Sequence, residues 1–370
     1  MKKPSLNQCF KAVFKFCMVL VFILCFLYLC EMGFIYESCN VRKVHADRMQ
    51  LAQGFAKQVI QAKCRPSFAK TEMSRMFNAK YNKDLTSFMK KTQDFNKSLY
   101  TYGPPFGFHE YFDQVDNILE LLPEHDLPKV LQSKDCKRCI VLGNGGILHG
   151  LQLGHAINQY DVVIRLNNAP VQGYVQDVGE KTTIRMTYPE GAPVSEKEYT
   201  HNSLFVTVLF KHADIKWLHA ILTNETLSLW NRLFFWKNVP ERLPLTLNQF
   251  RILNPLIVKE TALDILQYPE PNTKWIGWEK NVPTIGVMAV VLATHLCDEV
   301  SLAGFGYDLS QLDTPLHYYD NYCMRAMKRQ PMHDITKEKK FLQTLVKEDI
   351  VKDLSGGIHC AFCDPIQQEI

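Results

Sequence analysis

The stretch from Cys136 to Arg185 constrains the fold more than any other part of this 370-residue chain. Within it, the apolar run 140–142 breaks into Gly143-Asn144-Gly145-Gly146 and then resumes. This order predicts a buried strand, a tight loop and the start of a helix, which is the layout of a nucleotide site. Glycines there let backbone amides approach an anionic ligand, and the Asn144 side chain can bind a ribose or a base edge without adding charge.

An ordinary strand-to-helix turn stays open as the alternative to a nucleotide site. Leu148 stands where the dinucleotide fingerprint requires its third glycine. No acidic residue suited to a ribose ends a second strand. The stretch alone therefore does not decide between a ligand site and a structural turn.

Apolar runs and helical stretches alternate along the remaining chain. The apolar runs are 139–142, 161–166, 204–210, 251–258 and 299–305, and the longer helical stretches include 214–236 and 284–296. This alternation predicts an α/β fold with a mainly parallel sheet. Glycines and prolines at 103–107 begin the compact region and Gly356-Gly357 ends it, so we expect one domain over 101–357 and a C-terminal tail over 358–370.

The N-terminus predicts a membrane anchor. Residues 16–36 are apolar apart from Glu31 and Gly33, which is long enough for a helix across a thin bilayer. Four lysines precede this run, so residues 1–15 are expected in the cytosol and the bulk of the chain across the membrane. A cleaved signal peptide is the alternative, but the run is not followed by an A-x-A-like site. Residues 37–100 show only weak helical periodicity and are interpreted as a lumenal stem that packs in part on the domain.

Composition favours an enzyme of the secretory lumen over a binder of polyanions. The tail holds four lysines and no acidic residue, which leaves 42 − 4 = 38 basic against 38 acidic groups in the exported part. This balance excludes nucleic acid from the expected partners. Eight of the twelve cysteines follow the predicted span, which indicates disulfides in an oxidising compartment. Glycosylation sequons at Asn96 and Asn224 fit the same route.

Three further groups of residues follow the glycine loop. Pro283-Thr284-Ile285-Gly286 opens a helix that leads to a strand broken at Gly304. The second group is His317-Tyr318-Tyr319-Asp320, and the third is His333 with Glu338 five residues later. Each is weak evidence by itself, because a lone histidine near a helix start is usually a satisfied surface or core residue.

In this order and spacing, the four groups resemble the signature motifs of the eukaryotic sialyltransferases, glycosyltransferase family 29. The large motif covers about 139–185, the small one 283–306, the third 317–320, and the H-x-x-x-x-E motif 333–338. The resemblance extends over about 100–357 and includes the single membrane anchor. It implies a single Rossmann-like α/β/α domain, a variant of the GT-A glycosyltransferase fold.

The resemblance also implies the chemistry. The donor would be CMP-sialic acid, and a galactose hydroxyl would displace CMP in one inverting step. That hydroxyl needs a general base, a role for which imidazole is suited. His333 takes this role by its place in the motif, and Glu338 would orient the ring or stabilise its charged form. Glu338 can equally be a favourable carboxylate in the first turn of a helix predicted over 336–346.

No metal is expected at the leaving phosphate, because the chain has no pair of aspartates two residues apart. The resemblance instead assigns a catalytic role at the phosphate to His317, supported by backbone amides at the Gly143 turn and at the start of the helix after Thr284. No other cofactor is implied. The donor-binding residues carried over from the motifs are Asn144, Gly145, Asn167, Thr284, Gly286, Gly304 and Tyr318.

The cysteine spacings admit two interpretations. Cys136 with Cys139 and Cys360 with Cys363 form two C-x-x-C pairs, which are compatible with zinc. Disulfides are the default in the secretory lumen. The family resemblance pairs Cys139 with Cys297, a bridge that joins the two donor motifs, and Cys64 with Cys136 is a further proposed pair. The 360–363 segment is either an extra disulfide or a disordered end.

The acceptor is expected from the branch of the family that the chain resembles. Segments such as 186–193 and 233–237 are similar to the sialyltransferases that act on lactosylceramide, at the 3-hydroxyl of its terminal galactose. A glycoprotein or oligosaccharide galactose is the alternative acceptor, and an inactive anchored glycan-binding protein is the alternative class. The expected location is the Golgi membrane, as a single-pass type II protein. A homodimer and complexes with other glycosyltransferases stay open.

A glycolipid acceptor would need an apolar approach surface near the membrane. The aromatic cluster from Trp230 to Trp236 is a candidate for that surface. At helical spacing such a cluster is more often part of a core.

Overall fold

Seven strands form one fully parallel sheet in the order β5-β4-β3-β2-β1-β6-β7. The computed structural model describes residues 18–22, 39, 46–91, 99, 101–122, 127–128, 131–132, 135–271, 281–329 and 332–363. The strands are β1 Arg138–Leu142, β2 Val162–Leu166, β3 Ile184–Thr187, β4 Leu204–Thr207, β5 Phe250–Ile252, β6 Glu299–Ala303 and β7 Val351–Asp353. The predicted α/β fold with a parallel sheet is confirmed.

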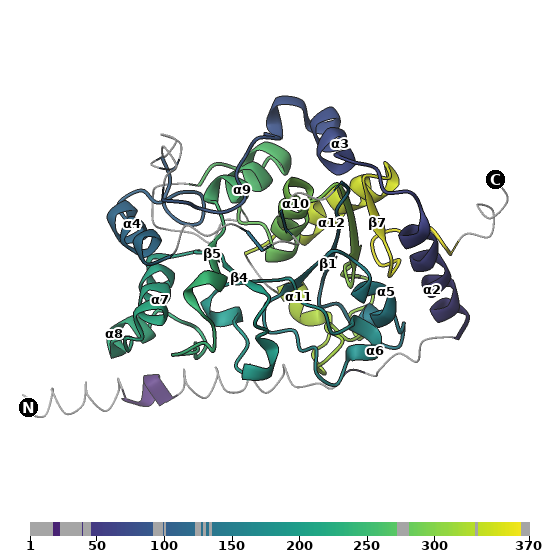
Figure 1. The fold of residues 1–370 in the computed structure, drawn as a ribbon. Helices are drawn as coiled ribbons and strands as arrows, with labels where there is room; N and C mark the ends of the chain where they lie inside the picture. Colours follow the sequence, from purple (N-terminus) through teal and green to yellow (C-terminus); the bar gives the residue numbers. More distant parts are fainter. Residues whose placement is uncertain are drawn as a thin grey trace, which may run out of the picture.

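Helices cover both faces of this sheet (Figure 1), with α3, α9, α10 and α12 on one side of the strands and α5, α6 and α7 on the other. The helices are α2 Ala46–Gln61, α3 Phe68–Phe77, α4 Phe112–Leu121, α5 Gly154–Asn158, α6 Val175–Val178, α7 His212–Thr223, α8 Leu229–Arg232, α9 Pro255–Lys259, α10 Ile285–Leu296, α11 Arg325–Arg329 and α12 Ile335–Lys347.

Alternation along β1 explains the two layers. Val141 faces the core that contains α10, whereas Ile140 and Leu142 face a second core with α2 and α5. Helix α10 is buried along almost its whole length, as its apolar sequence requires. Helix α10 begins at the carboxyl edge of the sheet, and its C-cap is Cys297. Cys297 forms a disulfide with Cys139 of β1, so α10 connects the carboxyl edge to β1.

Two predicted elements are split in the structure. The helical stretch 214–236 ends early because Asn224 adopts a left-handed conformation with φ 56° and caps α7, and α8 starts separately. The apolar run 251–258 changes from β5 to α9 because the Asn254 side chain accepts a hydrogen bond from the Leu256 amide at 3.0 Å. The sequence analysis missed β3 and β7, which have only four and three residues.

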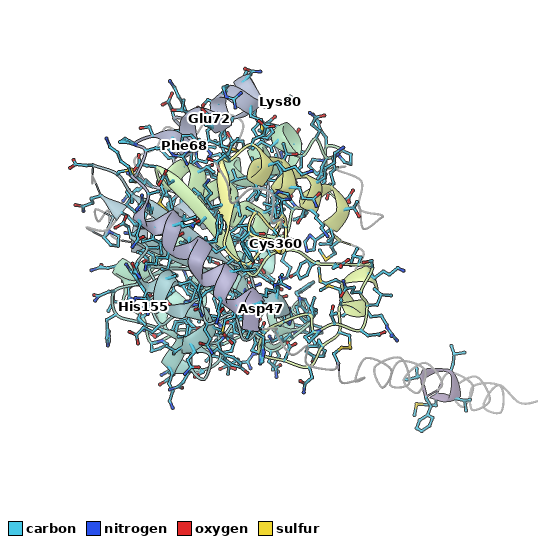
Figure 2. The ribbon with its side chains drawn as sticks, turned by 90° about the vertical axis from the view of Figure 1, so that its right-hand side faces the viewer. Asp47, Phe68, Glu72, Lys80, His155 and Cys360 are labelled. Atoms are coloured by element: carbon cyan, nitrogen blue, oxygen red, sulfur yellow. A yellow bond between two sulfur atoms is a disulfide. The ribbon has the colours of Figure 1, made fainter. Side chains whose placement is uncertain are left out.

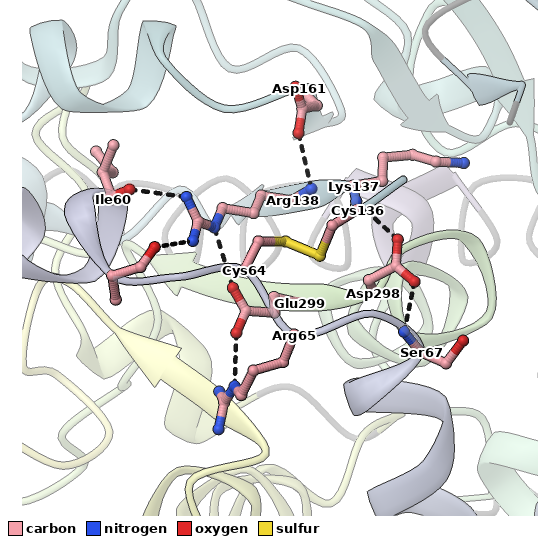
Figure 3. The surroundings of a disulfide bond; sticks show 11 residues. Ile60, Cys64, Arg65, Ser67, Cys136, Lys137, Arg138, Asp161, Asp298 and Glu299 are labelled. Atoms are coloured by element: carbon pink, nitrogen blue, oxygen red, sulfur yellow. Dashed lines mark hydrogen bonds and ion pairs between the residues drawn. A yellow bond between two sulfur atoms is a disulfide. The ribbon is translucent and has the colours of Figure 1, made fainter. Parts of the chain in front are cut away.

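Part of the predicted stem belongs to the folded domain. Ala52 and Ala56 of α2, and Ala69 and Met73 of α3, are fully buried in the two cores. The segment between these helices is fixed to the start of β1 by the Cys64 disulfide, as Figure 3 shows. The folded region therefore begins well before residue 101.

Charged groups hold the same junction together. The Glu299 carboxylate lies between the guanidinium groups of Arg65 and Arg138, at 2.6 and 3.0 Å (Figure 3). Asp298 accepts hydrogen bonds from the backbone amides of Ser67 and Lys137. Surface hollows of about 460 and 420 Å³ lie around this junction, at the amino ends of β1 and β6. They are therefore remote from the carboxyl edge, where ligands bind in open α/β sheets.

The end of the chain also packs on the domain. Asp353 accepts backbone hydrogen bonds from Ile358 and His359, and Phe362 lies 5.6 Å from the ring of Phe55 in α2. Figure 2 shows α2 crossing this side of the molecule, with Asp47 and Cys360 labelled. Residues 358–363, predicted as a tail, are therefore part of the fold.

The predicted anchor over 16–36 lies mostly outside the described residues. Among the residues that the structure describes, no helix is long and apolar enough to cross a membrane.

Candidate active site

The glycine loop after β1 is a packing junction. The amides of Gly143 and Gly145 donate to the carbonyls of Ala303 and Gly304, and the Gly146 amide donates to Leu316. A Cβ atom at Gly145 would lie 2.7 Å from the Gly304 carbonyl oxygen, so only glycine fits. The expectation that the amides of this turn bind phosphate is therefore wrong for these glycines, because their amides are already used within the protein.

A predicted feature of the same loop also differs. The residues after the glycines form one 3-10 turn, Gly146–Leu148, and not the first turn of an α-helix. The loop therefore offers no extended helix N-terminus to an anion. Its function in the structure is to bring the third motif against the end of β1, because Gly145 and His317 form an isolated antiparallel bridge.

His317 lies at the tip of a hairpin over 315–323. Its Nδ1 atom lies 2.7 Å from Oδ2 of Asp320, and its ring stacks on Tyr319 with 5.1 Å between centroids. A carboxylate at Nδ1 fixes the orientation of the ring. The neighbouring Tyr318 donates its hydroxyl to the Pro170 carbonyl at 2.6 Å and is buried, which fixes the hairpin from behind.

Asn144 presents an acceptor toward this junction. Its Oδ1 atom is buried and has no hydrogen-bond partner among the described residues. Burying an unpaired carbonyl oxygen costs roughly 1–3 kcal/mol, and a hydroxyl of a bound ligand would remove that cost. The backbone carbonyl of Asn144 also accepts a hydrogen bond from the Tyr318 amide at 3.1 Å, so Asn144 and the third motif are in contact.

Asn167 follows β2 in a left-handed conformation with φ 52°. Its amide donates to Met186, its carbonyl accepts from Arg185, and its Oδ1 accepts from the Thr187 hydroxyl at 3.3 Å. Buried Arg185 in turn forms an ion pair with Glu198 at 2.8 Å. Asn167 is thereby held at the carboxyl edge, one strand away from the glycine loop.

The small motif and the last motif meet at the start of α10. Thr284 is the N-cap of this helix, and its hydroxyl accepts from the Val287 amide. Glu338 of α12 accepts from the Thr284 amide at 2.8 Å and from the Thr284 hydroxyl at 2.5 Å. Tyr268 donates a longer hydrogen bond, 3.4 Å, to the same carboxyl. Burial raises the pKa of Glu338 to about 7, and the Thr284 hydrogen bonds lower it.

The expected role of Glu338 as the partner of His333 is therefore wrong in its geometry. The His333 ring uses Nδ1 to bond the Val282 carbonyl at 2.8 Å, just before α10, while Glu338 bonds Thr284 and Tyr268. Five positions along the chain separate the two side chains enough for different partners. Glu338 does lie in the first turn of α12, as the alternative interpretation had it.

The bond to Val282 defines the chemistry of the His333 ring. A backbone carbonyl only accepts a hydrogen bond, so Nδ1 carries the hydrogen and Nε2 of the neutral ring keeps its lone pair. Burial lowers the pKa of His333, and the hydrogen bond to Val282 opposes this effect. The ring is therefore neutral near pH 7 and able to accept a proton, which a general base must do.

The fold brings together the glycine loop, Asn167, the α10 start and both histidines at the carboxyl edge. Gly304, with φ 77°, lies against Gly143, and the close packing of Gly286 against Phe305 continues this edge.

Sequence reasoning missed a charged cluster at the ends of β3 and β4. The Lys211 ammonium lies 2.7 Å from Glu190 and 2.9 Å from Asp214, and both carboxylates are fully buried. Burial raises the pKa of Asp214 to about 6, against the effect of Lys211. Glu190 lies in the segment 186–193, which was interpreted only through its resemblance to the family. No spacing in the sequence links this segment to Lys211.

The eight cysteines after residue 36 form four disulfides in the structure. Both expected bridges are present, Cys139 with Cys297 and Cys64 with Cys136. Cys360 pairs with Cys363, and the fourth bridge joins Cys39 to Cys323. These thiols are therefore not available to zinc. No cluster of three or more histidine, cysteine or acidic side chains suited to a metal occurs in the described part of the chain.

The aromatic cluster over 229–236 is exposed. Leu229, Trp230, Leu233, Phe234 and Trp236 are each between 67% and 79% exposed. The interpretation of this cluster as core is wrong, because α7 ends at Thr223 with Asn224 as its cap, and the separate helix α8 has no buried residue. Asn224 itself is exposed, and its glycosylation stays a prediction, while Asn96 lies outside the described residues.

Comparison with known proteins identifies the family of this site. The sequence pattern of glycosyltransferase family 29 (sialyltransferase) matches residues 87–350, which include all four motifs. The chain belongs to glycosyltransferase family 29. The family expected from the motifs is thus confirmed, and with it the sialyltransferase class of enzyme.

Individual relatives agree with this assignment. The lactosylceramide alpha-2,3-sialyltransferase of Pan troglodytes is 58% identical over 365 residues, 98% of this chain and 100% of the relative. The protein of the same name from Homo sapiens is 57% identical, over 98% of this chain and 87% of the relative. The crystal structure of a mammalian sialyltransferase in complex with Gal-beta-1-3GalNAc-ortho-nitrophenol matches with a TM-score of 0.61 at 22% identity, covering 79% of this chain and 98% of that one. This structural match concerns the fold.

Proposed function

We propose that this sialyltransferase moves sialic acid from CMP-sialic acid to the 3-hydroxyl of the terminal galactose of lactosylceramide. The observation that carries the acceptor is the identity of 58% with a relative of that name along nearly the whole chain. The exposed aromatic cluster at 229–236 supports a lipid-linked acceptor, because Trp, Phe and Leu side chains suit the interface of a bilayer.

His333 is the proposed general base. Its Nε2 lone pair, set by the Nδ1 bond to Val282, would take the proton of the galactose hydroxyl as that oxygen attacks the anomeric carbon. CMP leaves from the opposite face, so the configuration inverts. Glu338 is a positioning residue in this scheme, because it fixes Thr284 and the start of α10 rather than the ring.

The charge of the leaving phosphate would be met by His317 and by α10. Asp320 holds the His317 ring through Nδ1, and the imidazole can donate a hydrogen bond to a phosphate oxygen. The amides at the start of α10, around Gly286, carry the positive end of a 12-residue helix. Asn144 and Asn167 would bind the ribose and cytosine end, with the unpartnered Oδ1 of Asn144 accepting a hydroxyl.

The mechanism as proposed uses no metal. The sequence has no pair of aspartates two residues apart, and His317 together with the α10 start would supply hydrogen-bond donors at the phosphate. We further infer a Golgi enzyme anchored by residues 16–36 in a type II orientation, with its lysine-rich tail in the cytosol.

The experiment that tests this function compares two acceptors side by side. The full chain in detergent, with CMP-sialic acid and EDTA, is given lactosylceramide or a desialylated glycoprotein. Transfer to the lipid alone is expected. Transfer to the glycoprotein alone would overturn the acceptor and keep the reaction class, whereas loss of transfer in EDTA would overturn the metal-free mechanism.

A further inference from the structure

A disulfide fixes the chain just after the predicted anchor. Cys39 forms a bridge with Cys323, with 5.5 Å between Cα atoms, and its amide donates to the Asn321 carbonyl at 3.4 Å. Cys39 is only 8% exposed, so this residue is buried against the domain. The chain is thus attached to the catalytic fold before α2 begins at Ala46.

The attachment point belongs to the candidate active site. Cys323 pairs with Pro315 in an isolated antiparallel bridge, and the Leu316 amide donates to the Tyr322 carbonyl at 2.7 Å. His317 lies at the tip of this hairpin. Because Cys323 belongs to the hairpin, Cys39 is covalently joined to the element that holds His317. The same hairpin pairs with the glycine loop through Gly145 and His317.

The position of Cys39 limits its distance from the bilayer. The predicted span ends at residue 36, so 39 − 36 = 3 steps between consecutive Cα atoms lead from its end to Cys39. An extended chain covers about 3.5 Å per residue, which gives a reach of about 10 Å. Without the bridge, the first attachment would be α2 at residue 46, and the 46 − 36 = 10 steps between consecutive Cα atoms would reach about 35 Å.

We propose that the Cys39–Cys323 disulfide holds the active-site hairpin at the bilayer surface, with the bilayer as the partner of the 315–323 face. The inference rests on the proposed anchor and glycolipid acceptor. A site held at the bilayer surface would favour lactosylceramide as the acceptor, since its two-sugar headgroup projects only a short way from the lipid. Tyr322, 40% exposed, precedes Cys323, and exposed Lys328 of α11 follows it by five residues; both side chains suit the headgroup level.

A pair of matched insertions tests the inference. The full chain is placed in phosphatidylcholine vesicles that contain lactosylceramide. In one variant, 20 Gly/Ser residues are inserted between Tyr36 and Glu37, which adds a root-mean-square span of about 25 Å between bilayer and bridge. In the control, the same 20 residues are inserted between Arg42 and Lys43, after the bridge.

The expected results differ for the two insertions. The first should lower transfer to lactosylceramide in the vesicle on the order of tenfold, because the effective concentration of headgroup at the site falls. The second should leave that transfer unchanged, and both should keep transfer to free lactose. Equal transfer to the bilayer lipid by the two variants would overturn the inference. Absence of transfer to free lactose by the unaltered chain would instead count against the proposed function.

The bridge itself is tested separately. Peptide mapping without reduction should find a Cys39 peptide joined to a Cys323 peptide, and a free Cys39 would overturn the inference. In a Cys39→Ser background, the control insertion after Arg42 should also lower transfer to the bilayer lipid, because α2 then becomes the first attachment. Retained full transfer by that double variant would contradict the proposed role of the disulfide.

Discussion

Glu338 and Thr284 lie 54 positions apart in sequence and share two hydrogen bonds, of 2.8 and 2.5 Å. One carboxyl thereby fixes both the amide and the hydroxyl of the N-cap of α10. His333, on the segment just before α12, is bonded next to that N-cap through Val282. His333 and the start of α10 are thus positioned as one unit.

The buried Glu338 carboxyl should make folding stability depend on pH. Its pKa is about 7 in the folded protein against 4.5 in the unfolded chain, so the folded state binds the proton more tightly. The contribution is complete below pH 4.5 and is lost as the pH rises through 7, by up to about 3 kcal/mol. Urea unfolding at pH 5 and pH 8 measures it. Glu338→Gln should reduce the difference between the two pH values, and an unchanged difference would exclude Glu338 as its source.

The acid limb of kcat/KM should report His333. Burial lowers the pKa of His333, so activity should fall only below its ordinary value of 6.5. The base is inactive once it is protonated. Because Glu338 bonds Thr284 and not the ring, Glu338→Gln should lower kcat while leaving the midpoint of this limb in place. A shift of the midpoint by a full pH unit would show that Glu338 acts on the ring.

Glycine substitutions should separate close packing from simple flexibility. A Cβ at Gly145 would lie 2.7 Å from the Gly304 carbonyl oxygen, so Gly145→Ala should destabilise the fold by roughly 1–3 kcal/mol. Gly54 in α2 has nothing within 4 Å of its added Cβ, and Gly54→Ala should be neutral or stabilising by up to about 1 kcal/mol. Thermal unfolding of both variants checks this contrast. Equal effects would contradict the packing role of the loop.

The exposed aromatic cluster should matter only for a lipid acceptor. Trp230→Ser with Trp236→Ser removes two side chains that are 78% and 74% exposed, so stability should change little. Transfer to lactosylceramide in vesicles should fall several-fold, while transfer to free lactose should stay the same. Val194→Ser, at a side chain that is 77% exposed outside the cluster, is the matched control. Equal losses on both acceptors would contradict a membrane role for the cluster.

The sequence predicted features that depend on local order. Thr284 as the start of a helix and the helix near 336–346 follow from capping residues and periodicity, and both are present, as α10 and α12. The order of the motifs along the chain was enough to predict the family. Strands β1, β2 and β6 were apparent because their apolar runs are buried on both faces.

Features that depend on contacts between distant segments could not be predicted. The Gly143 and Gly145 amides donate hydrogen bonds to β6 and to the residue after it, which no local sequence pattern reveals. The partner of Glu338 is likewise set by the packing of α12 on α10. The exposure of Trp230 depends on where α7 ends. The spacing of the aromatic residues would be the same on a buried helix and on an exposed one, so it does not predict their exposure.

The most direct test of the account is sialic acid transfer by the full chain and by His333→Ala, each measured with CMP binding. The unaltered protein should convert lactosylceramide and CMP-sialic acid to the 3-sialylated product in EDTA. His333→Ala should lose turnover by a factor on the order of 10²–10⁴ and bind CMP as before. Undiminished turnover by His333→Ala would contradict its role as the general base, and no transfer by the unaltered protein would contradict the proposed reaction.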